Sequence, residues 1–291
     1  VEINALKQRI AELEKSIPSR SAPPPAAAGA STPHAVQVGG TTISWGGYIK
    51  ADAIYSRFSE AEVAQGIGRD TYVPNTIPVS AGSGDSHSTL DLHAKETRLV
   101  IKSETPLDGG GKIATLVEAD FIVAQGAGNE RVTNAYNPGL RRAFVSYGPW
   151  LAGQDWTTFL NLASLPETLD FVAFPTDGTV FVRQPMLRYS QGAFAIALEN
   201  PETTTLPQGG GAFTDTTDSV LPDLVARYVH KYSGGSEVSL AALLRQLKVD
   251  NGTPATDATS TAGGVALAGK LALGSDDLKF QLNYGDGIGR Y

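Results

Sequence analysis

The 291-residue chain has a composition that excludes several classes of protein. Charged residues make up 18% of it, below the usual quarter for soluble proteins, and the formal net charge of -7 argues against bulk attraction to nucleic acid. It contains no cysteine, which excludes disulfides, cysteine metal sites and cysteine nucleophiles, and no run of about 18 apolar residues that could form a transmembrane helix.

Residues 1–17, "VEINALKQRIAELEKSI", follow a heptad pattern. The apolar residues are spaced three and four apart, with charged residues between them: Ile3, Leu6, Ile10, Leu13 and Ile17. This spacing predicts a short helix with an oligomerising coiled-coil seam, although an amphipathic helix packed on its own chain fits the same pattern. Residues 18–40, rich in Pro, Ala and Ser, are predicted to form a tether between this helix and the next domain.

From residue 41 to residue 291 the periodicity changes to two, which indicates β-strands with one apolar and one polar face. Leu278, Phe280 and Leu282, for example, alternate with Lys279 and Gln281. The alternation predicts eleven strands, at residues 43–58, 88–103, 112–124, 140–148, 150–157, 183–190, 192–199, 222–232, 236–248, 263–273 and 277–286.

Short and long connections alternate between these strands. The short ones include "GP" at 148–149 and "QG" at 191–192, whereas the long polar ones include 59–87 and 158–182. An outer-membrane β-barrel has short turns at one end and long loops at the other. We therefore predict an all-β fold, an antiparallel transmembrane β-barrel over residues 41–291. The alternative is a soluble β-sandwich adhesin or binding domain tethered by the coiled coil, and it would not need detergent.

The stretch "GGYIKADAIYSRF", residues 46–58, shows what such a barrel requires. Lys50 and Asp52 fall on one face of the predicted strand, and Ile49, Ala51 and Ala53 fall on the other. In a large barrel the apolar face contacts lipid and the polar face contacts water in the lumen. The charged pair is therefore predicted to line a lumen.

The two ends of the chain suggest that the natural protein is longer. The chain begins at Val1, already inside the helical pattern, and its last predicted strand runs into "GDGIGRY" without a closing segment. Bacterial single-chain barrels have an even number of strands, whereas eleven are predicted here. We expect further strands beyond the C-terminal end, because an open edge of this length would promote aggregation.

Three segments carry a family resemblance: "ETRLVIKSETPLDGGGKIATLVEADF" (96–121), "LRRAFVSYGPWLAGQDWTTFLN" (140–161) and "VRQPMLRYS" (182–190). With the N-terminal heptad helix, they resemble the DcaP-type trimeric porins of Gram-negative outer membranes, over nearly the whole chain. The resemblance implies a sixteen-stranded barrel, a homotrimer, a periplasmic coiled coil and outer-membrane lipid around the barrel. It also implies the passage of small anionic solutes, notably dicarboxylates, with no cofactor and no chemical step.

Basic residues on the strands are the candidates for guiding such anions through the pore. We expect a ring of charged side chains to line the lumen: Arg98, Arg141, Arg188, Arg227, Lys231, Lys50, Asp52, Glu118 and Asp120. The alternative is that the arginines pair with Glu118, Asp120 or Asp52 and only brace the wall. Arg141 and Arg142 are adjacent, so a regular strand turns only one of them inward, and we favour Arg141.

The segment 157–184 is too long and too apolar for an exposed loop. The resemblance implies that it folds into the barrel as a constriction, and a lid outside the barrel is the alternative. Its acids, Glu167, Asp170 and Asp177, are then expected to face Arg98, Arg141 and Arg188 across the pore, with Arg183 at the end of the loop.

Catalytic and metal sites have little support in the sequence. The four histidines lack the spacing of a metal site, and no Gly-x-Ser-x-Gly motif is present. A membrane-embedded hydrolase would need a serine and a histidine brought together, and Ser146 and His230 are candidates by residue type only. We therefore predict neither an enzyme, a metal site nor a cofactor.

Overall fold

The computed structural model describes residues 34–60, 84–122, 133, 135–169, 178–205, 214–216, 218–250 and 257–291. The predicted coiled-coil helix at 1–17 and the tether up to residue 33 lie outside these residues. No helix in the described part of the chain is both long and apolar enough to cross a membrane.

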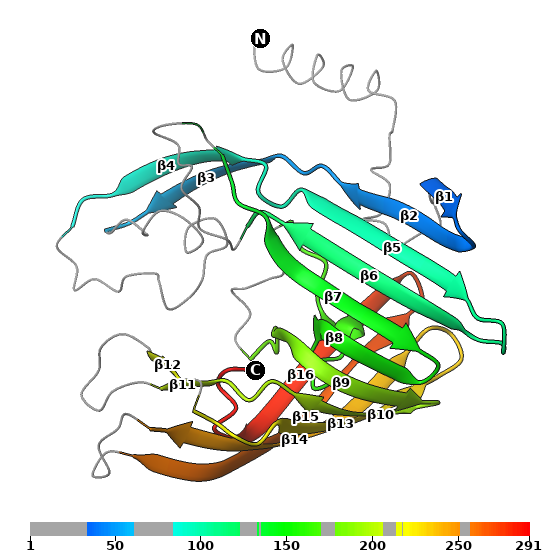
Figure 1. Cartoon of the computed structure of the whole chain (residues 1–291). Helices are drawn as coiled ribbons and strands as arrows, with labels where there is room; N and C mark the ends of the chain where they lie inside the picture. The colour runs from blue at the N-terminus through cyan, green and yellow to red at the C-terminus, as the bar shows by residue number, and fades with distance from the viewer. Residues whose placement is uncertain are drawn as a thin grey trace. The chain divides into compact units, whose positions relative to one another are not determined.

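The described residues form one large antiparallel sheet in which neighbouring strands follow the order of the chain (Figure 1). Its twelve strands are β1 (His34–Val38), β2 (Thr41–Tyr48), β5 (Arg98–Pro106), β6 (Lys112–Asp120), β7 (Gly139–Tyr147), β8 (Trp150–Trp156), β9 (Arg183–Gln191), β10 (Phe194–Glu199), β13 (Asp223–Lys231), β14 (Glu237–Val249), β15 (Ala258–Leu273) and β16 (Asp276–Asp286). Strands β1 and β16 are its two edges, and among the described residues no ladder joins them.

The first two predicted strands are each divided in two. The ranges 43–58 and 88–103 contain β2 and β5 of the large sheet, and also β3 (Asp52–Phe58) and β4 (His87–His93), which form a separate two-stranded sheet. At the junction, the three residues 49–51 lie opposite the four residues 94–97, so the pairing register shifts by one residue. The prediction of continuous strands was wrong because an extra residue on one strand breaks the ladder without changing the apolar pattern much.

Other boundaries also differ from the sequence prediction. Residues 34–38, assigned to the tether, form β1 and pair along their length with β2. Strand β15 begins at Ala258 rather than at 263, because Ala258–Ala262 extend the ladder with β14. The predicted loop 200–221 contains a small hairpin, β11 (Thr203–Thr205) with β12 (Thr214–Thr216). Short polar strands of this kind carry no apolar alternation, so the pattern did not indicate them.

The two faces of the large sheet have opposite chemistry. Large apolar side chains such as Leu99, Leu240 and Leu282 are between 55% and 65% exposed. On the other face Arg141 and Asp120 are only 2% and 0% exposed. A soluble protein buries its apolar face and exposes its charges, so this arrangement is inverted and fits a sheet whose apolar face contacts lipid.

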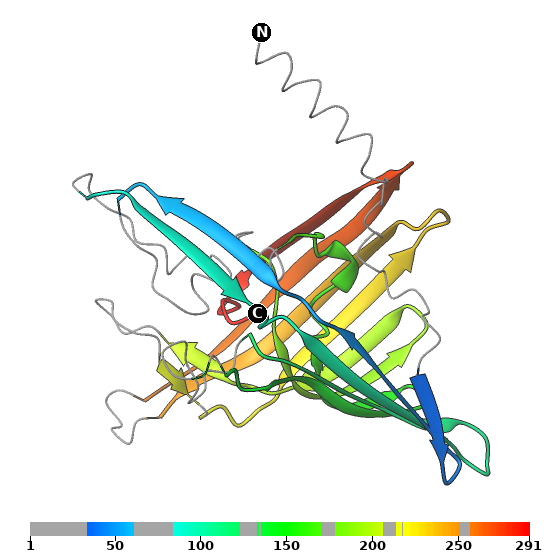
Figure 2. The same ribbon diagram turned by 90° about the horizontal axis from the view of Figure 1, so that it is seen from above.

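The charged face of the sheet is also covered by a segment that follows β8, residues 157–169, which we call the inward segment. Phe159 and Leu160 are almost fully buried and pack in one cluster with Val225 and Leu243 of the wall. The inward segment continues through a short 3-10 helix, η2 (Leu162–Ser164), which contacts β15 and β16. Figure 2 shows it beside these strands, on the concave side of the sheet.

The backbone at Gly47 accommodates no residue type other than glycine. Its φ is 131°, and a Cβ atom there would lie 1.9 Å from the carbonyl oxygen of Arg98. We expect Gly47→Ala to lower the free energy of unfolding by about 1–3 kcal/mol, measured by urea unfolding in lipid vesicles. The neighbouring Gly46→Ala is the control, since nothing lies within 4 Å of its added Cβ atom. Equal stability of the two variants would contradict the strained geometry at Gly47.

Candidate functional site

A cluster of arginines and acids lies on the concave face, on strands β5 to β9. We call it the arginine cluster, and it consists of five arginines and three acids: Arg98, Arg141, Arg142, Arg183, Arg188, Glu118, Asp120 and Asp155. The two-residue periodicity of neighbouring antiparallel strands aligns most of these side chains on one face.

A β-bulge lets two adjacent arginines reach the same acids. Glu118 pairs with Arg142 in the β6–β7 ladder, and the next residue, Ala119, pairs with Leu140, so Arg141 is the extra residue. The Nε and Nη1 atoms of Arg141 lie 2.6 and 2.5 Å from carboxylate oxygens of Glu118 and Asp120. The expectation that only one of the two arginines turns inward was wrong, because it assumed a regular strand.

Asp155 forms ion pairs with both Arg142 and Arg188, and it was not among the predicted site residues. Its two carboxylate oxygens lie 2.6 Å from Arg142 Nε and 2.5 Å from Arg188 Nη2. Asp155 stands in the "GQDWTTF" stretch on β8, which lies between β7, with Arg142, and β9, with Arg188, both in sequence and in the sheet. Its parity with Arg188 across the β8–β9 ladder was the signal that could have identified it.

The cluster carries more positive than negative groups. Arg98 lies 3.7 Å from both Glu118 and Asp120, a longer distance than those of Arg141. Arg183, the first residue of β9, lies with its Cζ atom 4.9 Å from the centre of the Trp156 ring, in a cation–π contact. Five guanidinium groups therefore stand against three carboxylates, which leaves two positive charges in excess.

A second polar network lies around β13 and the chain's last residues. Arg245 Nε lies 3.3 Å from Asp223 Oδ2, and the Tyr291 hydroxyl donates to the same oxygen at 2.8 Å. Burial and the carboxylates of Glu199 and Asp223 raise the pKa of Tyr291, so it remains a donor. Glu199 accepts hydrogen bonds from Thr157, Thr158 and Gln184, which anchors the start of the inward segment.

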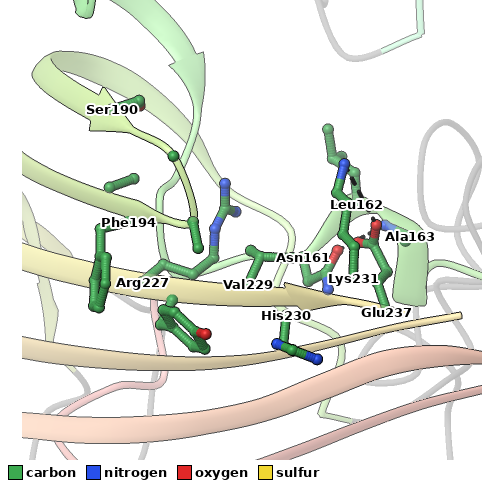
Figure 3. A pocket seen from close by; sticks show the side chains of 14 residues that line it. Asn161, Leu162, Ala163, Ser190, Phe194, Arg227, Val229, His230, Lys231 and Glu237 are labelled. Atoms are coloured by element: carbon green, nitrogen blue, oxygen red, sulfur yellow. Dashed lines mark hydrogen bonds and ion pairs between the residues drawn. The ribbon is translucent and has the colours of Figure 1, made fainter. Parts of the chain in front are cut away.

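Arg227 and Lys231 lie apart from the arginine cluster, beside a cavity of about 750 Å³ between the inward segment and strands β10, β13 and β14. Figure 3 shows the side chains of Arg227 and Lys231 on one side of β13 and His230 on the other. Arg227 donates to the backbone carbonyl of Leu160, and Lys231 lies 3.9 Å from Glu237. Among the described residues, no carboxylate lies within salt-bridge distance of Arg227.

The comparisons with known proteins identify the family. The family model of the DcaP outer membrane protein matches residues 26–291. The chain belongs to the DcaP outer membrane protein family. The family resemblance found in the sequence is thereby confirmed, and with it an outer-membrane location. The soluble adhesin loses its support, because the exposed apolar face and the family both contradict it.

The fold of this DcaP family member is also that of a solved outer-membrane channel. The outer membrane channel DcaP of Acinetobacter baumannii matches with a TM-score of 0.62 and 24% sequence identity. The match covers 84% of this chain and 64% of that channel, so the present chain spans about two thirds of its length. At this identity the likeness establishes the all-β fold. No curated protein sequence matches the chain.

Two further predicted pore residues, Lys50 and Asp52, lie at the junction between β2 and β3. Lys50 Nζ lies 2.9 Å from Asp52 Oδ1 and 2.5 Å from Glu96 Oε2. His93 Nδ1 lies 3.6 Å from the second oxygen of Asp52. Lys50 and Asp52 thus contact each other and Glu96, whereas the acids that contact Arg98 are Glu118 and Asp120.

Of the three predicted loop acids, only Glu167 lies among the described residues. Glu167 forms its ion pair with Lys279 of β16, at 3.5 Å, and not with Arg98, Arg141 or Arg188. The closest carboxylates of these arginines are those of the wall, and the place of Glu167 across the pore stays a prediction. Asp170 and Asp177 lie outside the described residues. Among the described residues, no group of three or more potential ligands is placed to hold a metal ion.

Asp155 is expected to be a stability determinant of the wall. Its replacement by asparagine leaves Arg142 and Arg188 without their closest carboxylate. We expect Asp155→Asn to lower the free energy of unfolding by about 3 kcal/mol, measured by urea unfolding in vesicles. The control is Asp277→Asn, which removes a half-exposed pair with Lys270 at 3.8 Å and should cost less than about 1 kcal/mol. A loss no larger than that of the control would argue against a bracing role.

Proposed function

We propose that this DcaP family member is a passive outer-membrane channel for small anionic solutes, with dicarboxylates as the favoured class. The observation that carries the proposal is the excess of guanidinium groups in the arginine cluster, on the face of the sheet that does not contact lipid. The inverted burial of the sheet and the family support the channel itself. Solutes would move down their own gradient, without a cofactor or a chemical step.

The arginines of the proposed pore fall into two groups. Arg141, Arg142 and Arg188 each lie within about 2.6 Å of a carboxylate, so their charge is largely matched and they brace the wall. Arg183 and Arg227 have no carboxylate within salt-bridge distance among the described residues. We assign the contact with passing anions to these two, because a guanidinium group binds carboxylates in bidentate fashion.

The remaining predicted pore residues have secondary roles in this proposal. Lys231 is exposed beside the cavity at Arg227, where it adds positive charge. Arg98, at 3.7 Å from its acids, is held more loosely than Arg141 and can also face a solute. Lys50 and Asp52 neutralise one another at the β2–β3 junction and contribute little net field.

The inward segment is proposed to narrow the pore. Its apolar residues pack on the wall, which supports a place inside the barrel over a lid outside it. In a water-filled pore, a narrower passage brings each solute closer to the fixed charges and strengthens their effect. A sixteen-stranded barrel, which the family resemblance implies, is part of the same proposal.

We expect Arg183→Gln to reduce the preference for anions. One unit charge about 4 Å from an ion in water contributes about 1 kcal/mol, so the anion-to-cation permeability ratio should fall roughly two- to fivefold. The measurement is the reversal potential of the full-length protein in planar bilayers under a salt gradient. Lys112→Gln is the matched control, because it removes one exposed positive charge paired with Glu104 at a hairpin turn. An unchanged ratio would show that Arg183 does not guide anions.

A homotrimer joined by the N-terminal coiled coil completes the proposal. The heptad seam at residues 1–17 and the family resemblance support it. We expect Leu6→Asp with Leu13→Asp, which places charges in the apolar seam, to weaken the assembly, as measured by native mass spectrometry in mild detergent. The control is Gln8→Asp, which lies off the seam. Trimers that persist unchanged would place the assembly contacts in the barrel instead.

A further inference from the structure

All three ammonium donors of Lys50 have an acceptor. Besides the carboxylates of Asp52 and Glu96, Nζ donates to the backbone carbonyl of Leu169 at 3.0 Å. An ammonium group offers three donors, so Lys50 has none left over. Two of its acceptors belong to the wall, at the β2–β3 and β4–β5 junctions, and the third belongs to the inward segment.

The backbone of Lys50 is held in place by the opposite side of the same junction. Its N–H donates to Thr97 Oγ1 at 3.3 Å, and the Thr97 hydroxyl donates back to the Lys50 carbonyl at 3.4 Å. The interruption of the ladder at 49–51 therefore gives Lys50 a fixed position outside the regular strand. From this position the Lys50 side chain reaches the backbone carbonyl of Leu169.

A second lysine holds the same stretch from another part of the sheet. Lys279, on β16, lies 3.5 Å from Glu167 Oε1. Nearby, Gln281 of β16 accepts a hydrogen bond from the Ser164 hydroxyl at 3.4 Å. Glu167 and Leu169 are two residues apart, yet Glu167 contacts β16, the last strand of the sheet order, and Leu169 contacts the junction that follows β2, its second strand.

Packing does not explain how this end of the inward segment is held. Phe159 and Leu160, near its start, are 1% and 0% exposed, whereas Leu169 is 94% exposed. The first part of the segment is fixed by apolar burial, and the described contacts of Glu167 and Leu169 are polar. Among the described contacts, those with Lys50 and Lys279 hold Leu169 and Glu167.

We infer that Lys50 and Lys279 are positioning residues that clamp the inward segment at residues 167–169 between two walls of the sheet. They act on solutes only through the segment, by fixing how far it reaches across the concave face. The effect on permeation rests on the proposed channel function, whereas the clamp itself is a geometric property that is measurable without conduction.

The test uses a spin label on the full-length protein in vesicles. Because these 291 residues contain no cysteine, Leu169→Cys adds the one labelling site among them and keeps the backbone carbonyl that Lys50 contacts. We expect Lys50→Met and Lys279→Met each to cause loss of the immobilised component in the electron paramagnetic resonance spectrum of this label. Lys112→Met is the control and should leave the spectrum unchanged. An unchanged spectrum in both clamp variants would overturn the inference.

Two further variants separate the clamp from general destabilisation. Lys50→Met leaves Asp52 and Glu96 without their cation, so Lys50→Met with Glu96→Gln removes one of the unpaired charges and should show the same loss. The exchange of Lys279→Glu with Glu167→Lys restores an ion pair of reversed polarity, and it should recover the immobilised component that Lys279→Glu alone loses. Failure of the exchange to recover it would count against the pair as a clamp.

Conduction provides the second measurement. In Lys50→Met and Lys279→Met, residues 167–169 are no longer held, and their motion should raise the open-channel current noise. The reversal potential should stay close to that of the parent protein. A parent protein without anion preference, combined with the spectral loss, would refute the proposed selectivity and keep the clamp. Anion preference in the parent protein, combined with unchanged spectra in the variants, would support the proposed selectivity and refute the clamp.

Discussion

The pairing of guanidinium groups with carboxylates on one face of the sheet is the interaction on which the rest of the structure depends. Charges taken out of bulk water are costly unless each finds a partner, and Glu118, Asp120 and Asp155 provide such partners for the arginines of β7 and β9. Once these pairs form, the apolar side chains have only the opposite face left, and they remain exposed there. The inverted burial of an outer-membrane wall follows from this division.

Two irregularities of the backbone serve this arrangement. The bulge at Arg141 turns two successive arginines to one face, so that both contact Glu118. The interruption at residues 49–51 releases Lys50 from the ladder and lets it contact both Glu96 and the inward segment. Each irregularity interrupts the backbone hydrogen bonds between two strands, and the charged contacts that it permits offset this loss. The sites of interest therefore coincide with the places where the strands are least regular.

The division between braced and unbraced arginines connects stability with the proposed selectivity. A guanidinium group that is matched by a close carboxylate stiffens the wall but offers little net attraction to a solute. Arg183 rests on the Trp156 ring and Arg227 on a backbone carbonyl, neither of which cancels the positive charge. Bracing and anion guidance, which appear as alternatives in the sequence, are thus assigned to different arginines on the same face.

The sequence by itself determined the strand periodicity, the short and long connections, the family and the parity of Arg98, Arg188 and Arg227, because these depend on residues near one another in the chain. It did not determine the split at 49–51, the inward turn of both Arg141 and Arg142, or the role of Asp155. Nor did it reveal that Glu167 pairs with Lys279 rather than with the arginines. These features depend on cross-strand register and on contacts between distant segments, and one extra residue in a strand changes both without altering the apolar pattern.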